Sequence, residues 1–492
     1  MKMKKRFMSM LLVLSMCITL AVPLTVSATE VTVTDEPMIS EWAFSDLFRG
    51  EYYGIIPQYW AEEDITNSIN HPEFRILLAK LRHKILDTDC AVQARSENPR
   101  LAHDVTVEDA VKALYIELSN YDFTVEDKLV DLGMVGVDPV QYMKAIGVFT
   151  GKNGEQSLDE MCSYEQALVM TTRLITFLYD ELDVDSKGFL WEVNSGDNKA
   201  YLLGSIHMAS TDIYPFSQTM YNAFEESDAL VLEADLFNLS GMFEAMELQY
   251  YDDGSTLKDH ISPELYETVV EIYAGLGASE EIVSLFKPWA LGFELSNLAT
   301  TNTEGGEDIN TALGIDLHFT TLAYLIEKPI YEIEGIYKQY TIMNSFSPDL
   351  QELILYSGVY SLLMKDDMDS EEETISANEM VSQWLQCWSE GDIERFRELY
   401  MPEFDNAVIE LDDESLELFD EEDLKAINNL QEEFKDKLMT KRDVDMADYI
   451  DQLLQAEGSN TYFIIVGSGH YISDYSVLDI LEEMGYELKQ IK

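Results

Sequence analysis

The chain has 492 residues, and its 93 Asp and Glu residues outnumber its 32 Lys and Arg residues, so its formal net charge is −61 at neutral pH. A negative field of this strength repels nucleic acid and anionic membrane surfaces, and neither is expected as a partner. The acidity suits a well-solvated surface, cation binding, or the cation-rich meshwork of a cell wall.

The first 28 residues have the anatomy of a secretory signal peptide. Four basic residues in the segment MKMKKR precede an apolar run from Phe7 to Val26, and the small residues Ser27 and Ala28 complete a cleavage site. An uncleaved anchor is the alternative, because about 18 apolar residues can span a bilayer, but Pro23 and the cleavage site favour removal. We therefore predict an extracytoplasmic protein, secreted or associated with the cell wall of a Gram-positive-like bacterium, without a stable membrane span after processing.

Beyond the signal peptide, three cysteines remain, Cys90, Cys162 and Cys387, far apart and without a C-x-x-C metal spacing. An oxidising location permits one disulfide but not a disulfide-stapled scaffold. The remaining length of roughly 460 residues predicts two or three domains, each long enough to bury its own core.

Residues 29–185 are predicted to form a small all-helical domain. Two similar stretches each combine a short helix, a Gly-containing turn and a longer amphipathic helix. The first runs from SEWAFSDLFRGEYYG to NHPEFRILLAKLRHKI, and the second from VQYMKAIGVFTGKNG to CSYEQALVMTTRLITFLY. This pattern resembles the S-layer homology repeat of Gram-positive surface proteins, which holds cell-wall polysaccharide.

The resemblance is incomplete where each longer helix begins, because that family usually has a Thr-Arg-Ala-Glu-like tetrad there. The chain has Asn70-His71-Pro72-Glu73 in the first stretch and Ser163-Tyr164-Glu165-Gln166 in the second, and neither contains the arginine. Two interpretations stay open: a degenerate helical module that serves packing or spacing, or a module with a cell-wall polymer as its partner.

Residues 186–492 are predicted to form an α/β domain, because short apolar strands alternate with helices from Phe189 onward. The junction at 183–188 has the aspartate spacing of a calcium loop, but its twelfth position is Asn194 rather than Glu, so we interpret it as a linker turn. Residues 366–440 are rich in Glu and Asp and are predicted to be a solvated helical insertion, with an interaction surface as the alternative.

Four predicted strands of this domain each deliver a chemically useful side chain at or near their end. Residues 199–203 run into Gly204-Ser205-Ile206-His207, residues 229–232 into Glu233, residues 329–331 into Glu332-Ile333-Glu334, and residues 461–466 into Gly467-Ser468-Gly469-His470. Ligands of open α/β sheets bind beyond the carboxyl ends of the strands, so these side chains are expected to converge on one crevice.

The G-x-x-H pattern occurs at two of these ends and has a mechanical logic. Glycine at a strand end allows the sharp turn that swings an imidazole over the sheet edge, and two imidazoles with a carboxylate can hold a divalent metal with a position open for water. Alone, His207 also fits a capping role, Glu233 a salt bridge, and His318 a structural position. No GxSxG elbow, HExxH motif, phosphate loop or dinucleotide glycine fingerprint is present.

An ordered series of motifs from about residue 189 to residue 490 resembles the TraB/GumN family, which includes the animal TIKI metalloproteases. The series is FLWEVNSGDNKAYLLGSIHMAS, SDALVLEADL, FKPWAL, GIDLHF, KPIYEIEGIYKQ, KRDVDMADYI, and YFIIVGSGH followed by EEMGYEL. The resemblance implies a mixed sheet flanked by helices and a metal-dependent, peptidase-like site. The chain departs from the family pattern at Asp443, where Asn is common, and at residues 471–474, which lack a glycine.

The resemblance also implies roles for individual residues. His207 and His470 match the paired histidines, and with Glu233 they would hold a divalent metal, Mn, Co or Zn. The catalytic candidates are Glu233, Glu334, Gln339 and Arg442; one glutamate would act as general base, and the arginine would hold a carboxylate or polarise a carbonyl. We therefore expect an exported metal-dependent hydrolase that acts on peptides or proteins. The alternative is a non-catalytic cell-surface protein that binds a peptide or signal molecule in the same crevice.

Overall fold

In a computed structural model of the chain, the described residues are 39–57, 59–60, 64–99, 101, 103–150, 158–301, 309–368, 377–405 and 421–492. The predicted signal peptide lies outside them. The chain forms two compact units. We call 39–186 together with 211–218 the N-terminal unit, and 187–210 together with 219–492 the sheet unit.

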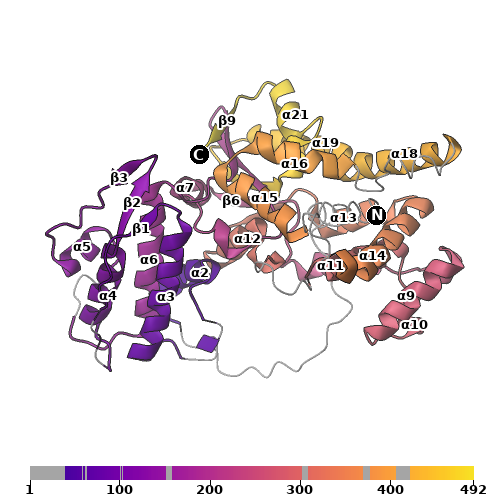
Figure 1. Cartoon of the computed structure of the whole chain (residues 1–492). Helices are drawn as coiled ribbons and strands as arrows, with labels where there is room; N and C mark the ends of the chain where they lie inside the picture. Colours follow the sequence, from indigo (N-terminus) through magenta and orange to yellow (C-terminus); the bar gives the residue numbers. More distant parts are fainter. Residues whose placement is uncertain are drawn as a thin grey trace. The chain divides into compact units, whose positions relative to one another are not determined.

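The N-terminal unit is mainly helical, as expected. Its elements are η2 (Glu41–Ala43), α2 (Phe44–Tyr52), α3 (His71–Asp87), β1 (Ala91–Gln93), α4 (Val107–Ser119), β2 (Tyr121–Val125), β3 (Lys128–Val130), α5 (Pro139–Ala145) and α6 (Tyr164–Leu182). The long helices α3 and α6 lie side by side (Figure 1). Their buried apolar faces, which recur at helical spacing, make the core of this unit.

A three-stranded antiparallel sheet, β1-β2-β3, adds to these helices and differs from the all-helical prediction. Its strands have only three to five residues, too few for an alternating pattern to be recognised. Glu126 and Asp127, both with positive φ, make the two-residue turn between β2 and β3, although neither is the glycine that usually marks such a hairpin.

The two tetrads compared with the wall-binding repeat start helices in this structure. The Asn70 side chain accepts a hydrogen bond from the Glu73 backbone N–H at the start of α3. Ser163 and Gln166 form a reciprocal capping box at the start of α6. These polar residues therefore satisfy backbone donors that the first turn of each helix leaves unpaired.

The sheet unit contains a six-stranded mixed sheet, which confirms the predicted α/β class. The strand order is β7-β6-β8-β5-β4-β9. The strands are β4 (Phe189–Ser195), β5 (Asn198–Ser205), β6 (Ala229–Leu232), β7 (Ile330–Glu332), β8 (Thr461–Gly467) and β9 (Leu488–Ile491). The four strands from β7 to β5 are parallel, and β4 pairs antiparallel with both β5 and β9. All four residues of β6 and most of β5 and β8 are buried, as expected for strands covered on both faces.

Helices connect and flank these strands (Figure 1). They are α7 (Gln218–Glu226), α8 (Leu239–Glu247), η5 (Leu257–Asp259), α9 (Pro263–Gly275), α10 (Glu280–Val283), α11 (Pro288–Thr301), η6 (Thr311–Leu313), α12 (Ile315–Leu325), α13 (Gly335–Asn344), α14 (Pro348–Met368), α15 (Ala377–Glu390), α16 (Ile393–Asp405), α18 (Glu421–Lys435), the π-helical turn η7 (Asp436–Thr440), α19 (Lys441–Leu454), α20 (Gly469–Ile472) and α21 (Val477–Glu483). The short helix η4 (Thr211–Ile213) belongs to the N-terminal unit. In the described part of the chain, no helix is both long and apolar enough to cross a membrane.

The acidic segment 366–440 is helical where it is described, but α15 and α16 are not merely solvated. Trp384, Trp388, Phe396 and Tyr400 are almost completely buried, and the Trp388 indole donates a 2.7 Å hydrogen bond to the Gly204 carbonyl of β5. This part of the segment therefore belongs to the core of the sheet unit. Its aromatic residues recur at helical spacing, and their burial outweighs the acidity of the same segment.

Candidate active site

Four of the predicted site residues follow the carboxyl ends of the four parallel strands. His207 lies two residues beyond β5, Glu233 directly follows β6, Glu334 lies at the start of α13 after β7, and His470 lies in α20 after β8. Because these strands run in the same direction, their ends meet at one edge of the sheet. Glu233, Glu334 and His470 have side chains that are almost completely buried there, and that of His207 is 9% exposed.

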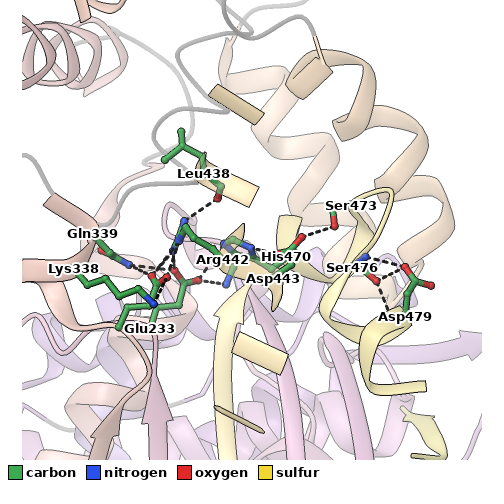
Figure 2. Close-up of polar contacts among 12 residues, drawn as sticks. Glu233, Lys338, Gln339, Leu438, Arg442, Asp443, His470, Ser473, Ser476 and Asp479 are labelled. Carbon is green, nitrogen blue, oxygen red and sulfur yellow. Dashed lines mark hydrogen bonds and ion pairs between the residues drawn. The ribbon is translucent and has the colours of Figure 1, made fainter. Parts of the chain in front are cut away.

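Arg442, at the start of α19, contacts both glutamates, and Figure 2 shows it beside Glu233. Its Nη2 donates to Glu233 Oε2 and, at 2.9 Å, to Glu334 Oε2, while its Nε lies 3.1 Å from each Glu334 oxygen. The Gln339 amide donates to Glu233 Oε2 at 3.3 Å and to Glu334 Oε2 at 3.4 Å. The structure therefore brings four of the sequence-predicted residues into one polar cluster.

The π-helical turn η7 ends two residues before Arg442, and the Leu438 carbonyl of this turn accepts a 3.2 Å hydrogen bond from Arg442 Nη1. Such turns widen a helix locally and are frequent at functional sites. Here the turn supplies the Leu438 carbonyl oxygen, and its hydrogen bond orients the Arg442 guanidinium (Figure 2).

The electrostatics of Glu233 follow from this arrangement. Burial by itself raises the pKa of its carboxyl, but the Arg442 charge, together with His470, His207 and the Gly467 backbone N–H, holds the pKa below its usual range. The Gly467 N–H donates to Glu233 Oε1 at 2.6 Å. Glu233 is therefore ionised at neutral pH, although it is buried.

His470 lies between two carboxylates. Its Nδ1 is 2.5 Å from Asp443 Oδ1, and its Nε2 is 3.9 Å from Glu233 Oε1. The second oxygen of Asp443 accepts a 2.7 Å hydrogen bond from the Ser473 hydroxyl. Asp443 and Ser473 thus join the two segments at which the sequence departs from the family pattern.

His207 has a similar partner on a different helix. Its Nδ1 is 2.9 Å from Asp316 Oδ2 at the start of α12. Burial by itself lowers the pKa of His207, but the Asp316 charge and hydrogen bond outweigh burial, so that the pKa is raised. His207 also interacts electrostatically with Glu233 and Arg442, which ties it to the same cluster.

Sequence reasoning missed the contacts of Asp316, Asp443 and Ser473. Asp316 lies two residues before His318, in the string GIDLHF, and Asp443 directly follows Arg442, so both stood beside residues already singled out. His318 itself is completely buried and contacts the Tyr221 hydroxyl at 3.1 Å, in agreement with a structural position.

The donor set partly fits the expected metal. In both histidines Nδ1 is engaged by a carboxylate, which is the usual arrangement of metal-binding imidazoles and leaves Nε2 as the nitrogen that can bind. Glu233, however, is paired with Arg442, and within the described ranges no three His, Cys, Asp or Glu side chains are grouped so as to hold a metal ion. The two imidazoles therefore fit a metal ion, whereas the expected third ligand, Glu233, is paired with Arg442 in this structure.

Comparison with known proteins identifies the family. The model described as TraB/PrgY/gumN family matches residues 189–490. The chain is similar to the metalloprotease TIKI1 of Danio rerio, with 23% identity over 325 residues, 62% of this chain and 63% of that protein. It is also similar to the metalloprotease TIKI2 of Danio rerio, with 21% identity over 329 residues, 62% of this chain and 61% of that protein.

A shorter match joins the chain to the uncharacterized protein YbaP of Escherichia coli (strain K12), with 27% identity over 148 residues, 30% of this chain and 53% of that protein. Each match thus spans less than two thirds of the relative's length. No solved structure matches the chain significantly. The resemblance of the N-terminal region to S-layer homology repeats finds no support in these comparisons. Because the matching family model covers more than half of its residues, this chain belongs to the TraB/PrgY/gumN family.

Proposed function

We propose that this chain is an exported, metal-dependent hydrolase that cleaves peptides or proteins. The observation that carries the proposal is the pair of G-x-x-H histidines, each bound through Nδ1 to a carboxylate beside the buried, ionised Glu233. The names of the TIKI relatives, which are metalloproteases, support the same chemistry.

In this proposal, His207 and His470 would hold Mn, Co or Zn through Nε2, and Glu233 would become the third ligand by exchanging its contact with Arg442 for the metal. A bound divalent ion supplies electrophilic polarisation of a carbonyl and activation of water. Glu334 orients Arg442 and Gln339 through its hydrogen bonds. These two donors then hold the carbonyl or carboxylate oxygen of a substrate next to the histidines.

The charge of the whole chain favours some substrates over others. A formal net charge of −61 attracts cationic segments and repels acidic ones. This attraction reaches beyond about 10 Å only at ionic strengths below about 0.1 M. We therefore propose neutral or cationic peptides as the preferred substrates, with faster cleavage of cationic ones at low salt.

Metal uptake is the first test of this function. The purified chain is exposed to Mn²⁺, Co²⁺ or Zn²⁺, freed of excess metal, and analysed for its metal content, beside the double variant His207→Ala, His470→Ala. A second double variant, His83→Ala, His103→Ala, removes two exposed imidazoles as a matched control. About one ion per chain in the parent and in the control, with little in the first variant, supports the hydrolase and leads to a peptide-library screen.

Two other outcomes contradict the metal site. Equal metal content in all three proteins means that the ions bind elsewhere, for instance on the acidic surface. No metal in any of them, combined with retained binding of peptides, favours the non-catalytic binding protein. A loaded parent that binds peptides without cleaving any member of the library also favours a binding function.

A further inference from the structure

The Asp443 side chain contacts both His470 and Ser473, and Ser473 has no role in the function proposed above. The Asp443 side chain is completely buried in α19, and its two oxygens accept one hydrogen bond each. Oδ1 contacts His470 Nδ1 at 2.5 Å, and Oδ2 accepts from the Ser473 hydroxyl at 2.7 Å. Figure 2 shows Asp443, His470 and Ser473 on the side of Arg442 that faces away from Gln339.

The bond to Asp443 determines which nitrogen of His470 carries the proton. An ionised carboxylate only accepts hydrogen bonds, so the proton of this contact belongs to Nδ1. In a neutral imidazole the other nitrogen, Nε2, is then an acceptor with a free lone pair. That nitrogen lies 3.9 Å from Glu233 Oε1, on the side where the proposed metal would be held.

Ser473 restrains the carboxylate itself. A carboxylate with a single partner can rotate about its last bond and move the imidazole with it. A second hydrogen bond to the other oxygen restricts this rotation, and it also offsets part of the cost of burying the charge. The serine lies three residues after His470, at the end of the short helix α20, so the same segment supplies both donors.

We propose that Asp443, restrained by Ser473, is the positioning residue that fixes the tautomer and the ring orientation of His470. The proposal rests on the metal-dependent function proposed above, and it extends it to residues that contact neither metal nor substrate. Asp443 acts through His470 alone, by keeping the Nε2 lone pair directed toward the Glu233 side of the site.

The tautomer can be measured without any metal. Long-range proton–nitrogen NMR spectra of the metal-free full chain are recorded at about pH 8.5, above the usual imidazole pKa of about 6.5, and His470 is assigned with a His470→Gln variant. We expect the Nδ1-protonated form in the parent. The Asp443→Asn variant should keep this form, because its amide oxygen still accepts the proton of Nδ1, whereas Asp443→Ala should lose it.

Metal affinity gives the second measurement. Loss of a partner that orients a ligand typically weakens metal binding by about 10- to 100-fold, which is the loss expected for Asp443→Ala in calorimetric titrations with Zn²⁺ or Mn²⁺. Ser473→Ala should lose less, and Asp443→Asn should retain most of the affinity. Ser476→Ala is the matched control, because this nearby hydroxyl bonds Asp479 at 2.7 Å to cap α21 and should not change metal affinity.

The two measurements separate the inference from the function on which it rests. Suppose that the parent binds metal. If Asp443→Ala then has the same tautomer or the same metal affinity as the parent, the positioning role is wrong, and the proposed hydrolase is unaffected. Absence of metal binding by the parent removes the hydrolase, while the NMR result still tests what Asp443 does to His470. If Asp443→Ala does not fold, Ser473→Ala decides: it keeps the Asp443 acceptor and so should keep the Nδ1-protonated form, but its metal affinity must fall below that of Ser476→Ala, or the inference fails.

Discussion

Arg442 contacts two buried glutamates, so one positive charge stabilises two carboxylates of the site. The side chains of Arg442, Glu233 and Glu334 are 2%, 7% and 0% exposed, so their charges are shielded from water and need one another. Removing one partner of a buried ion pair leaves an uncompensated charge, which costs far more than the loss of an exposed pair.

We therefore expect Arg442→Met to lower the free energy of unfolding by about 3–5 kcal/mol. Urea unfolding of the metal-free chain measures the change. Lys441→Met is the matched control, because the neighbouring Lys441–Asp436 pair is largely exposed and should contribute no more than about 1 kcal/mol. Adding Glu233→Gln and Glu334→Gln to Arg442→Met should restore part of the loss. A cost equal to that of the control would contradict the central role of this charge cluster.

His207 should make stability depend on pH in a defined direction. Burial alone lowers its pKa, but Asp316 outweighs burial, so the pKa in the folded state is raised above the unfolded value of about 6.5. Between these two values the folded state binds more protons than the unfolded state, and stability falls as the pH rises. The contribution is complete below about pH 6.5 and is lost as the pH passes the folded-state pKa.

Urea unfolding of the metal-free chain between about pH 6 and pH 9 tests this dependence beside His207→Gln. One proton corresponds to at most about 1.4 kcal/mol per pH unit, and the variant should lack this part of the slope. Asp316→Asn should reduce the slope as well, because it removes the charge that raises the pKa. Identical slopes in the parent and His207→Gln would show that His207 is not the group responsible.

Among the helices, α15 connects the acidic segment to the sheet through one buried tryptophan. Trp384 and Trp388 lie one helical turn apart and are both completely buried. The indole N–H of Trp388 donates to the Gly204 carbonyl, whereas that of Trp384 has no hydrogen-bond partner among the described residues. Replacing each tryptophan by phenylalanine removes the same atoms, but only the replacement of Trp388 also removes a hydrogen bond. Comparing the two variants therefore separates the energy of the hydrogen bond from the energy of packing.

Trp388→Phe should therefore cost more stability than Trp384→Phe, by about 1 kcal/mol, the net contribution of one hydrogen bond. Both variants lose indole volume, so the loss that they share reports the cavity left behind. Chemical denaturation of both variants under one condition gives the difference. Equal costs would mean that the bond to Gly204 adds nothing to the attachment of α15.

At the scale of the whole molecule, the excess of acidic residues acts against the compact state. A formal charge of −61 produces self-repulsion that unfolding relieves. Raising the NaCl concentration from about 0.01 M to about 0.15 M shortens the screening length from about 30 Å to about 8 Å. We expect Tm, measured in the presence of a chelator, to rise over this range. A constant or falling Tm would show that ion pairs which salt weakens outweigh the repulsion.

The sequence by itself determined the fold class and the family, and it predicted which strand ends carry the candidate site residues. Short apolar runs that end in Gly-x-x-His or glutamate indicate strands and their ends, because the apolar pattern and the pleat of a strand are local properties of the chain. The direction of parallel strands then brings those ends together, which is why Glu233, Glu334 and His470 lie at one edge of the sheet. The strands β1 and β3 were not predicted, because three residues are too few to show an alternating apolar pattern.

Only the tertiary structure decided how these groups pair. His207 meets Asp316 across 109 residues of sequence, and Arg442 meets Glu233 across 209. No local pattern encodes such partners, because a pattern reports only the neighbours of a residue along its own helix or strand. Glu233 rather than a surface group is the partner of Arg442 because both side chains are buried, and burial makes an unpaired charge too costly.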